Sequence, residues 1–454
     1  MSALELAERA LRPAGPDALA LVTRERSLLL RFAANRPTQA TEVDDLTIEL
    51  AVERRGHVGR AETNSTDDEA LARCAQRAAA AADAAAAAGA GIYPGFSEPV
   101  AGAPVPAKAA TFDAGMGGDA LAAVFEIAAD AGLEAHGTWS AAEVERAVAR
   151  PGSSVAEVDS DAFMKVICIT PEGDDSRSGH ASQAAASAEA LEPRALTERA
   201  AAKALGSFAR SRERTELDAG VYPVVFEPDA MRSLLDLLAF TAFNGLAHAE
   251  GRGALAGRLG ESVAAPAINL SDSPLFTRTL SRGFDAEGTA KAPLPLIQDG
   301  VAHRVVHDIR SATLMGAAST GHALAPGGDP SGPHPTNLIL AGGGAENTAE
   351  LCGPIERGIY VTRLWYENVV RPKETLVTAV TRDGTFLIED GQVTRPLRDL
   401  RLTDSVFSIL SSVQALTSGL ELSSNGEFYG RRFAYGVVSP ALRAGRVRFT
   451  GPAG

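Results

Sequence analysis

The second half of the chain consists of short apolar segments separated by Gly- and Pro-rich turns, and this pattern limits the folds open to it. From residue 268 onward, strand-like runs cover 293–298, 301–309, 337–340, 359–366, 376–382 and 385–389. Asp-Gly dipeptides at 299–300, 383–384 and 390–391 are typical of tight hairpins. One helix is expected at about 403–414. The pattern predicts a β-rich, mostly antiparallel C-terminal domain.

The first half has a different texture, in which strands alternate with helices. Apolar runs at 18–23 and 28–32, separated by a charged break at 24–26, predict two short strands, and alternation over 46–52 predicts a third. Thr66 and Glu69 fit a capping box before an Ala-rich helix over 71–88. Further helices are expected over 119–133 and 193–207, and strands over 144–148 and 163–169. We therefore predict an α+β protein with a mixed α/β domain at 1–215 and a β-rich domain at 216–454.

A strand followed by a helix opens the second domain. Residues 222–226 are strand-like, and Pro228 suits the first turn of a helix. Met231, Leu234, Leu235 and Leu238 follow at the spacing of one helical face. We expect this face to be buried.

Charge and cysteine content restrict the compartment and the partners. The 454 residues carry a formal net charge of −14, which opposes nonspecific binding to nucleic acid or to an anionic membrane. The three cysteines form no C-x-x-C pair, so we expect buried thiols in a reducing compartment. No apolar run approaches the roughly 20 residues of a membrane span, and the N-terminus lacks the pattern of a signal peptide. These features predict a cytoplasmic protein.

Common catalytic motifs are absent from the sequence. It contains no G-x-x-x-x-G-K-[ST], G-x-S-x-G, S-x-x-K, H-E-x-x-H or H-E-x-x-x-H. Residues 115–120 fit the loose dinucleotide fingerprint, but a helix entry is the simpler interpretation. His303 and His307 have i, i+4 spacing in a strand-like stretch, where their rings would lie about 13 Å apart, too far for one metal ion. A dispersed Ser-His-Asp triad stays open, because triads are defined by geometry.

Several blocks in the second half resemble the TldD/PmbA family. They occur in the family's order: LDAGVYPVVFEP at 217–228, GRLGESV at 257–263, FDAEGT at 284–289, LIQDG at 296–300, PTNL at 335–338, RGIYVT at 357–362, FLIEDGQV at 386–393 and RPL at 395–397. The resemblance implies a mixed α/β N-terminal domain, a β-rich C-terminal domain and a metallopeptidase-type assembly. TldD-like subunits carry zinc on an H-E-x-x-x-H helix after the 222–226 strand. TldE/PmbA-like subunits lack this motif and pair with the other kind around an extended peptide.

The residues that align with the zinc motif differ from it. Residues 236–241 read Asp-Leu-Leu-Ala-Phe-Thr and contain neither the histidines nor the glutamate. No cysteine lies near the C-terminus to complete a metal site. Residues 368–375 also differ from the Gly/Ser-rich loop expected there. We therefore assign no catalytic residue, metal ligand or cofactor to this chain, and the resemblance implies zinc in a TldD-like partner.

Three functions follow from this interpretation. The first is a non-catalytic TldE/PmbA-like subunit that shapes a peptide chamber, in a heterodimer with a TldD-like metallopeptidase subunit or as a homodimer. The second is a self-sufficient hydrolase with a dispersed site, and the third is a non-enzymatic protein-binding modulator, as the family's older name, modulator of DNA gyrase, suggests. Neither direct nucleic-acid contact nor membrane binding is expected. Candidate residues of a substrate groove are His248, Phe284, Glu287, His303 and His307.

Overall fold

The computed structural model describes residues 1–89, 91–102, 112–171, 177–207, 209–211, 213–424 and 432–453. Within these ranges the strands form two six-stranded sheets and one nine-stranded sheet. The predicted α+β class is confirmed. Neighbouring strands are antiparallel except in two parallel pairs, both in the C-terminal half. The domain boundary near residue 215 stays a prediction.

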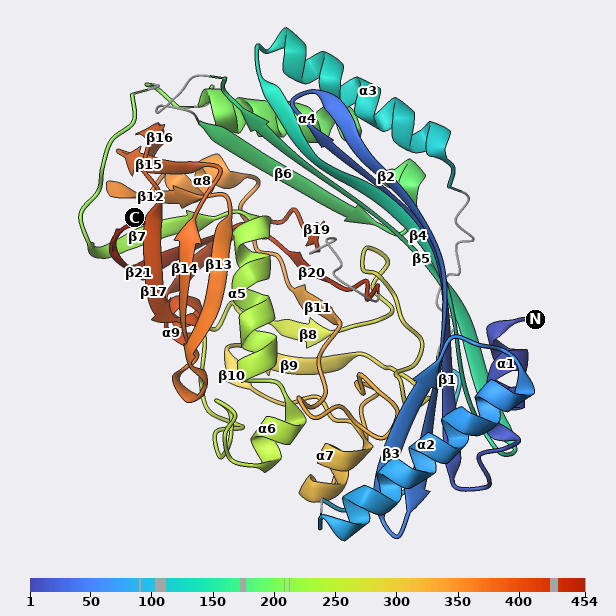
Figure 1. Cartoon of the computed structure of the whole chain (residues 1–454). Coiled ribbons are helices and arrows are strands. Elements are labelled where there is room, and N and C mark those ends of the chain that lie inside the picture. The colour runs from blue at the N-terminus through green and yellow to red at the C-terminus, as the bar shows by residue number, and fades with distance from the viewer. Residues whose placement is uncertain are drawn as a thin grey trace.

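The first sheet is antiparallel and has the order β3-β2-β1-β4-β5-β6. Its strands are β1 (Ala18–Ala33), β2 (Arg36–Arg54), β3 (His57–Thr63), β4 (Glu134–Arg150), β5 (Ser153–Ile169) and β6 (Ser178–Ala185). Its helices are α1 (Ala3–Leu11), α2 (Asp68–Ala87), α3 (Ala114–Asp130) and α4 (Pro193–Leu205), and a 3₁₀ turn covers Ala188–Ala190. Figure 1 shows the long strands curving past the C-terminal half, with α1 and α2 at one end and α3 and α4 at the other.

Strand length explains why this sheet has two separate cores. A strand of 17 residues, such as β4, extends for about 55 Å, which is longer than any of the four helices. One core packs α1 and α2 against Ile48 and Leu50, and the other packs α3 and α4 against Trp139 and Met164. Between them lies the charged stretch 24–26, for which the sequence predicts a break. That prediction is wrong, because β1 continues through it with Glu25 opposite Asp45, and these side chains lie outside both cores.

The C-terminal half contains the other two sheets. The second sheet has the order β10-β9-β8-β11-β20-β19, and the third has the order β13-β14-β17-β21-β7-β12-β15-β16, with β18 paired to β21. The second comprises β8 (Leu270–Asp272), β9 (Leu294–Gln298), β10 (Val301–Ala302), β11 (Asn337–Leu340), β19 (Glu421–Ser423) and β20 (Gly436–Ser439). The third comprises β7 (Gly220–Phe226), β12 (Arg357–Val361), β13 (Leu364–Arg371), β14 (Leu376–Thr381), β15 (Thr385–Glu389), β16 (Gln392–Pro396), β17 (Leu400–Ser405), β18 (Val413–Leu416) and β21 (Leu442–Pro452). The connecting helices are α5 (Pro228–Thr241), α6 (Gly245–Ala249), α7 (Ile309–Met315), α8 (Thr348–Cys352) and α9 (Val406–Ser411), with a 3₁₀ turn at Pro372–Glu374.

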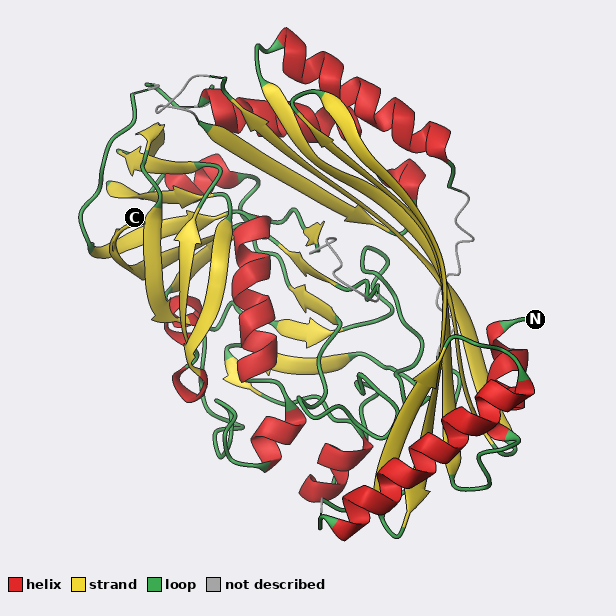
Figure 2. Ribbon diagram, in the orientation of Figure 1, coloured by secondary structure: helices red, strands yellow, loops and turns green. Residues whose placement is uncertain are grey.

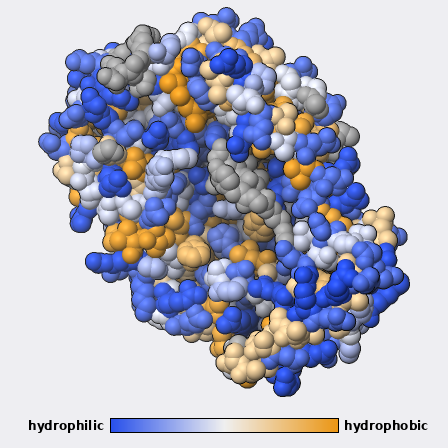
Figure 3. Space-filling model, in the orientation of Figure 1, coloured by the Kyte–Doolittle hydropathy of each residue, from blue (hydrophilic) through white to orange (hydrophobic). Residues whose placement is uncertain are grey.

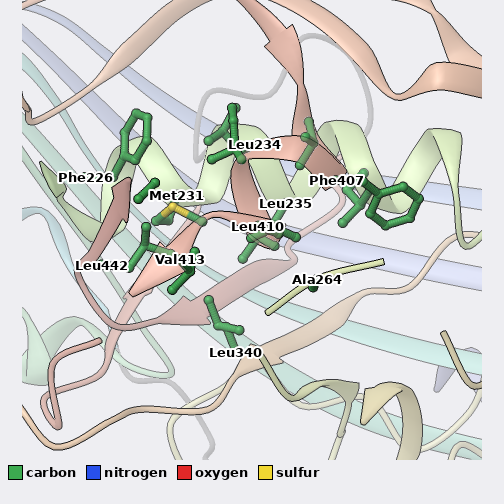
Figure 4. Close-up of a cluster of buried hydrophobic side chains, with 14 of the residues drawn as sticks. Phe226, Met231, Leu234, Leu235, Ala264, Leu340, Phe407, Leu410, Val413 and Leu442 are labelled. Carbon is green, nitrogen blue, oxygen red and sulfur yellow. The ribbon is translucent and has the colours of Figure 1, made fainter. Parts of the chain in front are cut away.

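Helix α5 connects the second and third sheets. It packs against β13, β19 and β20, and Figure 2 shows it among the strands of the C-terminal half. The predicted apolar face, Met231, Leu234, Leu235 and Leu238, is fully buried. Figure 4 shows part of this core, in which side chains from α5 and α9 lie close to side chains from several strands. Burial of one face leaves the opposite face of α5 free to carry polar side chains.

Several local predictions are confirmed and others are corrected. Asp-Gly pairs at 299–300 and 390–391 form two-residue hairpins with both residues at positive φ. The pair at 383–384 is no hairpin, because β14 and β15 are not neighbours in the sheet. The strand predicted over 301–309 ends at residue 302, since Asp308 caps α7, and the helix predicted over 403–414 shrinks to α9 between two strands. The cap of α2 is Asp67 rather than Thr66.

Two further predictions concern thiols and glycines. All three cysteines are buried free thiols, as expected. Residues 115–120 lie in the first turns of α3, which is the predicted helix entry. Among the described helices, none combines the length and the apolar character that crossing a lipid bilayer requires.

Candidate functional site

A polar stripe runs along the face of α5 opposite its buried face. The stripe consists of Asp229, Arg232, Ser233 and Asp236. Together with Leu237 these residues line a cavity of about 250 Å³. Pro228 begins the helix, so the stripe starts in its first turn. The local sequence therefore determines which side chains α5 presents to the cavity.

The other walls come from all three sheets. The side chains are Phe163 and Lys165 from β5, His180 and Ser182 from β6, Trp365 and Glu367 from β13, Arg363 just before β13, Ser424 just after β19, and Tyr435 just before β20. Strands β6, β13 and β19 are each the edge strand of their sheet. Three sheet edges thus reach one cavity, and sheet edges carry backbone groups that an extended peptide can pair with.

Two carboxylates and one guanidinium dominate the middle of the cavity. Arg232 lies 2.9 Å from Asp236 and 3.9 Å from Glu367, and the Ser233 hydroxyl donates a hydrogen bond to Glu367. Burial raises the pKa of Asp236 to about 6, although the Arg232 charge opposes the change. The second oxygen of Asp236, Oδ1, is buried and has no hydrogen-bond partner in the described part of the chain.

A histidine–aspartate pair lies beside this group. Nδ1 of His180 is 3.1 Å from Asp229, and the Ser182 hydroxyl donates to both oxygens of Asp229 at 3.0 Å. Burial lowers the pKa of His180 to about 4, and the Arg363 charge adds to the effect. Burial alone would raise the pKa of Asp229, but the bond with His180 lowers it overall. At neutral pH the imidazole is neutral and the aspartate is charged, and the serine bonds the aspartate, not the histidine, so this is no serine-protease triad.

A wider groove continues from the cavity. It has a volume of about 960 Å³, and it shares Ser182 and Asp229 with the smaller cavity. Lys203 of α4 lies 2.6 Å from Glu227, which also accepts a hydrogen bond from the Tyr360 hydroxyl at 2.8 Å. Together the two spaces could hold an extended chain alongside β6.

Figure 3 shows one face of the molecule as largely hydrophilic, with hydrophobic residues in separate patches.

Residues 236–241, which the resemblance aligns with the zinc motif, do not fit a zinc ion. Asp236 is paired with Arg232, Leu237 has no donor atom, and the Thr241 hydroxyl donates to the Leu237 carbonyl at 2.8 Å. Zinc requires His, Cys or carboxylate ligands without a competing cation. Within the described ranges, no group of three or more His, Cys, Asp and Glu residues is placed to hold a metal ion.

None of the five groove residues suggested by the sequence lines the cavity along α5. His248 of α6 and His307 are both nearly buried, and they lie near enough that the charge of His248 helps to lower the pKa of His307, after burial. His303 is exposed on its own after β10. Phe284 packs on the first sheet, and Glu287 is fully buried near it.

Glu287 has a structural environment. Its two oxygens accept hydrogen bonds from the Tyr93 hydroxyl and from the backbone N–H of Ile309, both at 2.9 Å. Burial raises its pKa well above the usual value, and the charge of Asp285 adds to this. The glutamate therefore connects the segment after α2 to the start of α7.

Sequence reasoning missed the residues that line the cavity. The i, i+3, i+7 spacing of Asp229, Arg232 and Asp236 opposite the apolar face was an available signal for the α5 stripe. His180 and Glu367 carried no such signal, because they lie on strands of different sheets.

Comparison with known proteins agrees with this architecture. A model described as PmbA/TldA metallopeptidase C-terminal domain matches residues 219–451, and one described as PmbA/TldA metallopeptidase domain 1 matches 18–82. A metalloprotease from Methanothermobacter thermautotrophicus is 27% identical over 173 residues, which are 38% of this chain and 37% of that protein. A metalloprotease PmbA homolog from Haemophilus influenzae is 24% identical over 206 residues, 45% of this chain and 42% of that protein. The chain thus spans less than half the length of the curated relatives it matches.

A solved structure shares the fold along nearly the whole chain. TldE from Thermococcus kodakarensis superposes with a TM-score of 0.84 at 20% sequence identity, and the match covers 98% of this chain and 99% of that one. The C-terminal family model alone spans more than half of the chain. This chain belongs to the PmbA/TldD metallopeptidase family.

Proposed function

We propose that this chain is a TldE/PmbA-like subunit that binds extended peptides and holds no catalytic metal of its own. It would work in the cytoplasm with a TldD-like zinc metallopeptidase subunit, or pair with a second copy of itself. Cleavage of unfolded peptides would take place at the zinc site of the TldD-like partner. The role of this chain would be to shape the chamber and to bind the peptide backbone.

The observation that carries this proposal is Arg232. Its guanidinium lies 2.9 Å from Asp236 and 3.9 Å from Glu367, in the part of α5 where the family's zinc motif would be. A fixed cation there already pairs with Asp236, and it would repel a divalent ion. The arrangement leaves a polar cavity of about 250 Å³ that shares Ser182 and Asp229 with the wider groove.

The sheet edges support the peptide-binding role. An extended peptide can add to an edge strand through backbone hydrogen bonds, which require no particular side chains. Edge strand β6 runs beside both spaces, since Ser182 borders the cavity and the groove. This geometry suits a subunit that holds varied, unfolded peptides.

Metal analysis and peptide cleavage test the proposal together. The purified chain should contain no stoichiometric zinc and should cleave no unfolded peptide alone. Mixed with a TldD-like protein from the same source, it should form a complex that cleaves unfolded peptides. Changing the glutamate of the partner's H-E-x-x-x-H motif to glutamine is the control, and it should abolish cleavage. One zinc per chain together with activity of the isolated chain would overturn the proposal.

A further inference from the structure

The cavity along α5 carries an excess of negative charge. The acidic and strongly basic residues that line it are Lys165, Asp229, Arg232, Asp236, Arg363 and Glu367. Arg363 is already balanced by Asp383, which lies 2.6 Å from it outside the cavity lining. His180 is neutral at pH 7 because its pKa is lowered to about 4 by burial. The three remaining acids therefore face two bases.

Asp236 is the acid of the cavity that has a side-chain oxygen without a hydrogen-bond partner among the described residues. One of its oxygens pairs with Arg232 at 2.9 Å, whereas Oδ1 is buried without a hydrogen-bond partner among the described residues. The Asp236 charge is also the main reason that the pKa of Tyr435 is raised. The negative field of this carboxylate therefore reaches the aromatic wall of the cavity.

The shape of the cavity restricts what could neutralise this field. Phe163, Trp365 and Tyr435 supply aromatic walls, and the volume is about 250 Å³. This volume is below the range of about 300–1,000 Å³ that is typical for whole small-molecule ligands. A long side chain with an apolar stem and a cationic end has matching chemistry, since the stem packs on aromatic rings and the end binds a carboxylate.

We propose that this cavity is a subsite for one basic side chain, lysine or arginine, of an extended peptide, and that Asp236 binds its cationic group. The inference rests on the proposed function, because it takes the ligand to be a peptide. A carboxylate can accept several hydrogen bonds, and the Asp236 side chain is 17% exposed, so Asp236 can keep Arg232 and also bind the ligand. A peptide paired with β6 beside Ser182 would direct alternate side chains toward the cavity.

Three matched peptides test the subsite by isothermal titration calorimetry at pH 7.5 and low salt. They are acetyl-Ala-Ala-Xaa-Ala-Ala-amide with lysine, norleucine or glutamate at Xaa. Norleucine keeps the apolar stem of lysine without its charge. We expect the lysine peptide to bind at least about tenfold more tightly than the norleucine peptide, as a charged hydrogen bond provides. The glutamate peptide should bind most weakly.

Two variants assign the preference to the cavity. Asp236→Asn should reduce the lysine preference to less than about threefold, and Glu367→Gln should reduce it in the same direction. Glu69→Gln is the matched control, because it removes one negative charge from a helical Arg pair on α2, far from the cavity, and should leave the preference unchanged. Thermal unfolding of each variant verifies that it is folded, and the second cavity variant keeps the test decisive if the first one is unstable.

A pH series provides an independent readout. The groups that face Asp236 are Arg232 on its own helix, Glu367 on β13 and Tyr435 before β20. Asp236 gains a proton between pH 7 and pH 5, because burial raises its pKa to about 6. The lysine preference should therefore fall over this interval in the wild type and stay flat in Asp236→Asn.

The possible failures are distinguishable. If the peptides bind with equal affinity, the subsite is refuted while peptide binding stands. Tightest binding of the glutamate peptide would also refute it, as would binding of Zn²⁺, Mg²⁺ or Ca²⁺ alone that depends on Asp236, because the occupant would then be a metal ion. If none of the three peptides binds, the proposed function itself is contradicted and the subsite falls with it.

Discussion

Replacing Asp236 by asparagine should remove a pH dependence of stability that the structure makes quantitative. The side chain is 17% exposed, and burial raises its pKa from the usual 3.8 to about 6. The folded state therefore binds the proton more tightly than the unfolded state does. The resulting stabilisation is fully present below pH 3.8 and is lost as the pH rises through 6.

The size of the effect follows from the two pKa values. Each tenfold difference in proton affinity corresponds to about 1.4 kcal/mol. The difference between a pKa of 3.8 and one of about 6 therefore corresponds to roughly 3 kcal/mol of unfolding free energy. Roughly 1 kcal/mol of it falls between pH 7 and pH 5. Asparagine has the same shape and does not titrate, so the variant should lack this contribution. Any constant cost of leaving Arg232 less neutralised shifts the whole curve without changing its slope.

Urea denaturation at pH 5, 6, 7 and 8 measures the difference. The unfolding free energy of the wild type minus that of Asp236→Asn should increase by about 1 kcal/mol as the pH falls from 7 to 5. Glu69→Gln, which changes an 84% exposed carboxylate, is the matched control for the loss of one negative charge. Parallel profiles for the wild type and Asp236→Asn would refute the argument that burial dominates the ionisation of this group.

Four further substitutions test packing and ionisation between and within the two halves. Asp161→Asn breaks a buried pair with Arg432 that joins the first sheet to the C-terminal half, and it should cost about 3–5 kcal/mol of unfolding free energy in thermal denaturation; an unchanged melting temperature would contradict the role of the pair. Glu287→Gln should gain stability relative to the wild type as the pH rises above the usual pKa of a glutamate, because burial raises the pKa of Glu287 and the stabilisation from its protonation is lost as the pH rises toward that pKa; a relative loss in urea denaturation would disprove this. Gly59→Ala would place a Cβ atom 2.1 Å from the backbone of α2 and should cost about 1–3 kcal/mol, whereas Gly118→Ala meets nothing within 4 Å in α3 and should gain about 0.5–1 kcal/mol; equal effects in urea denaturation would contradict both.

Local sequence patterns determined much of the secondary structure. The apolar spacing of α5 predicted its buried face, and Pro228 predicted its first turn, because both depend on residues only a few positions apart. The Asp-Gly pairs at 299–300 and 390–391 predicted hairpins for the same reason, since the turn conformation is a property of the dipeptide. The family resemblance is likewise a property of the sequence alone, because short blocks in the right order carry it.

Only the tertiary structure decided how these pieces combine. The Asp-Gly pair at 383–384 has the same local chemistry as the two hairpins, yet it connects strands that pair with other partners. The sequence predicts a break between strands at the charged stretch 24–26. In the structure this stretch lies within β1, between the part of the sheet that packs on α1 and α2 and the part that packs on α3 and α4. The candidate site needs His180 from β6, Asp236 from α5 and Glu367 from β13, which are far apart in sequence. Their meeting depends on which sheet edges pack together, and that is settled by burial across the whole molecule, which no local pattern encodes.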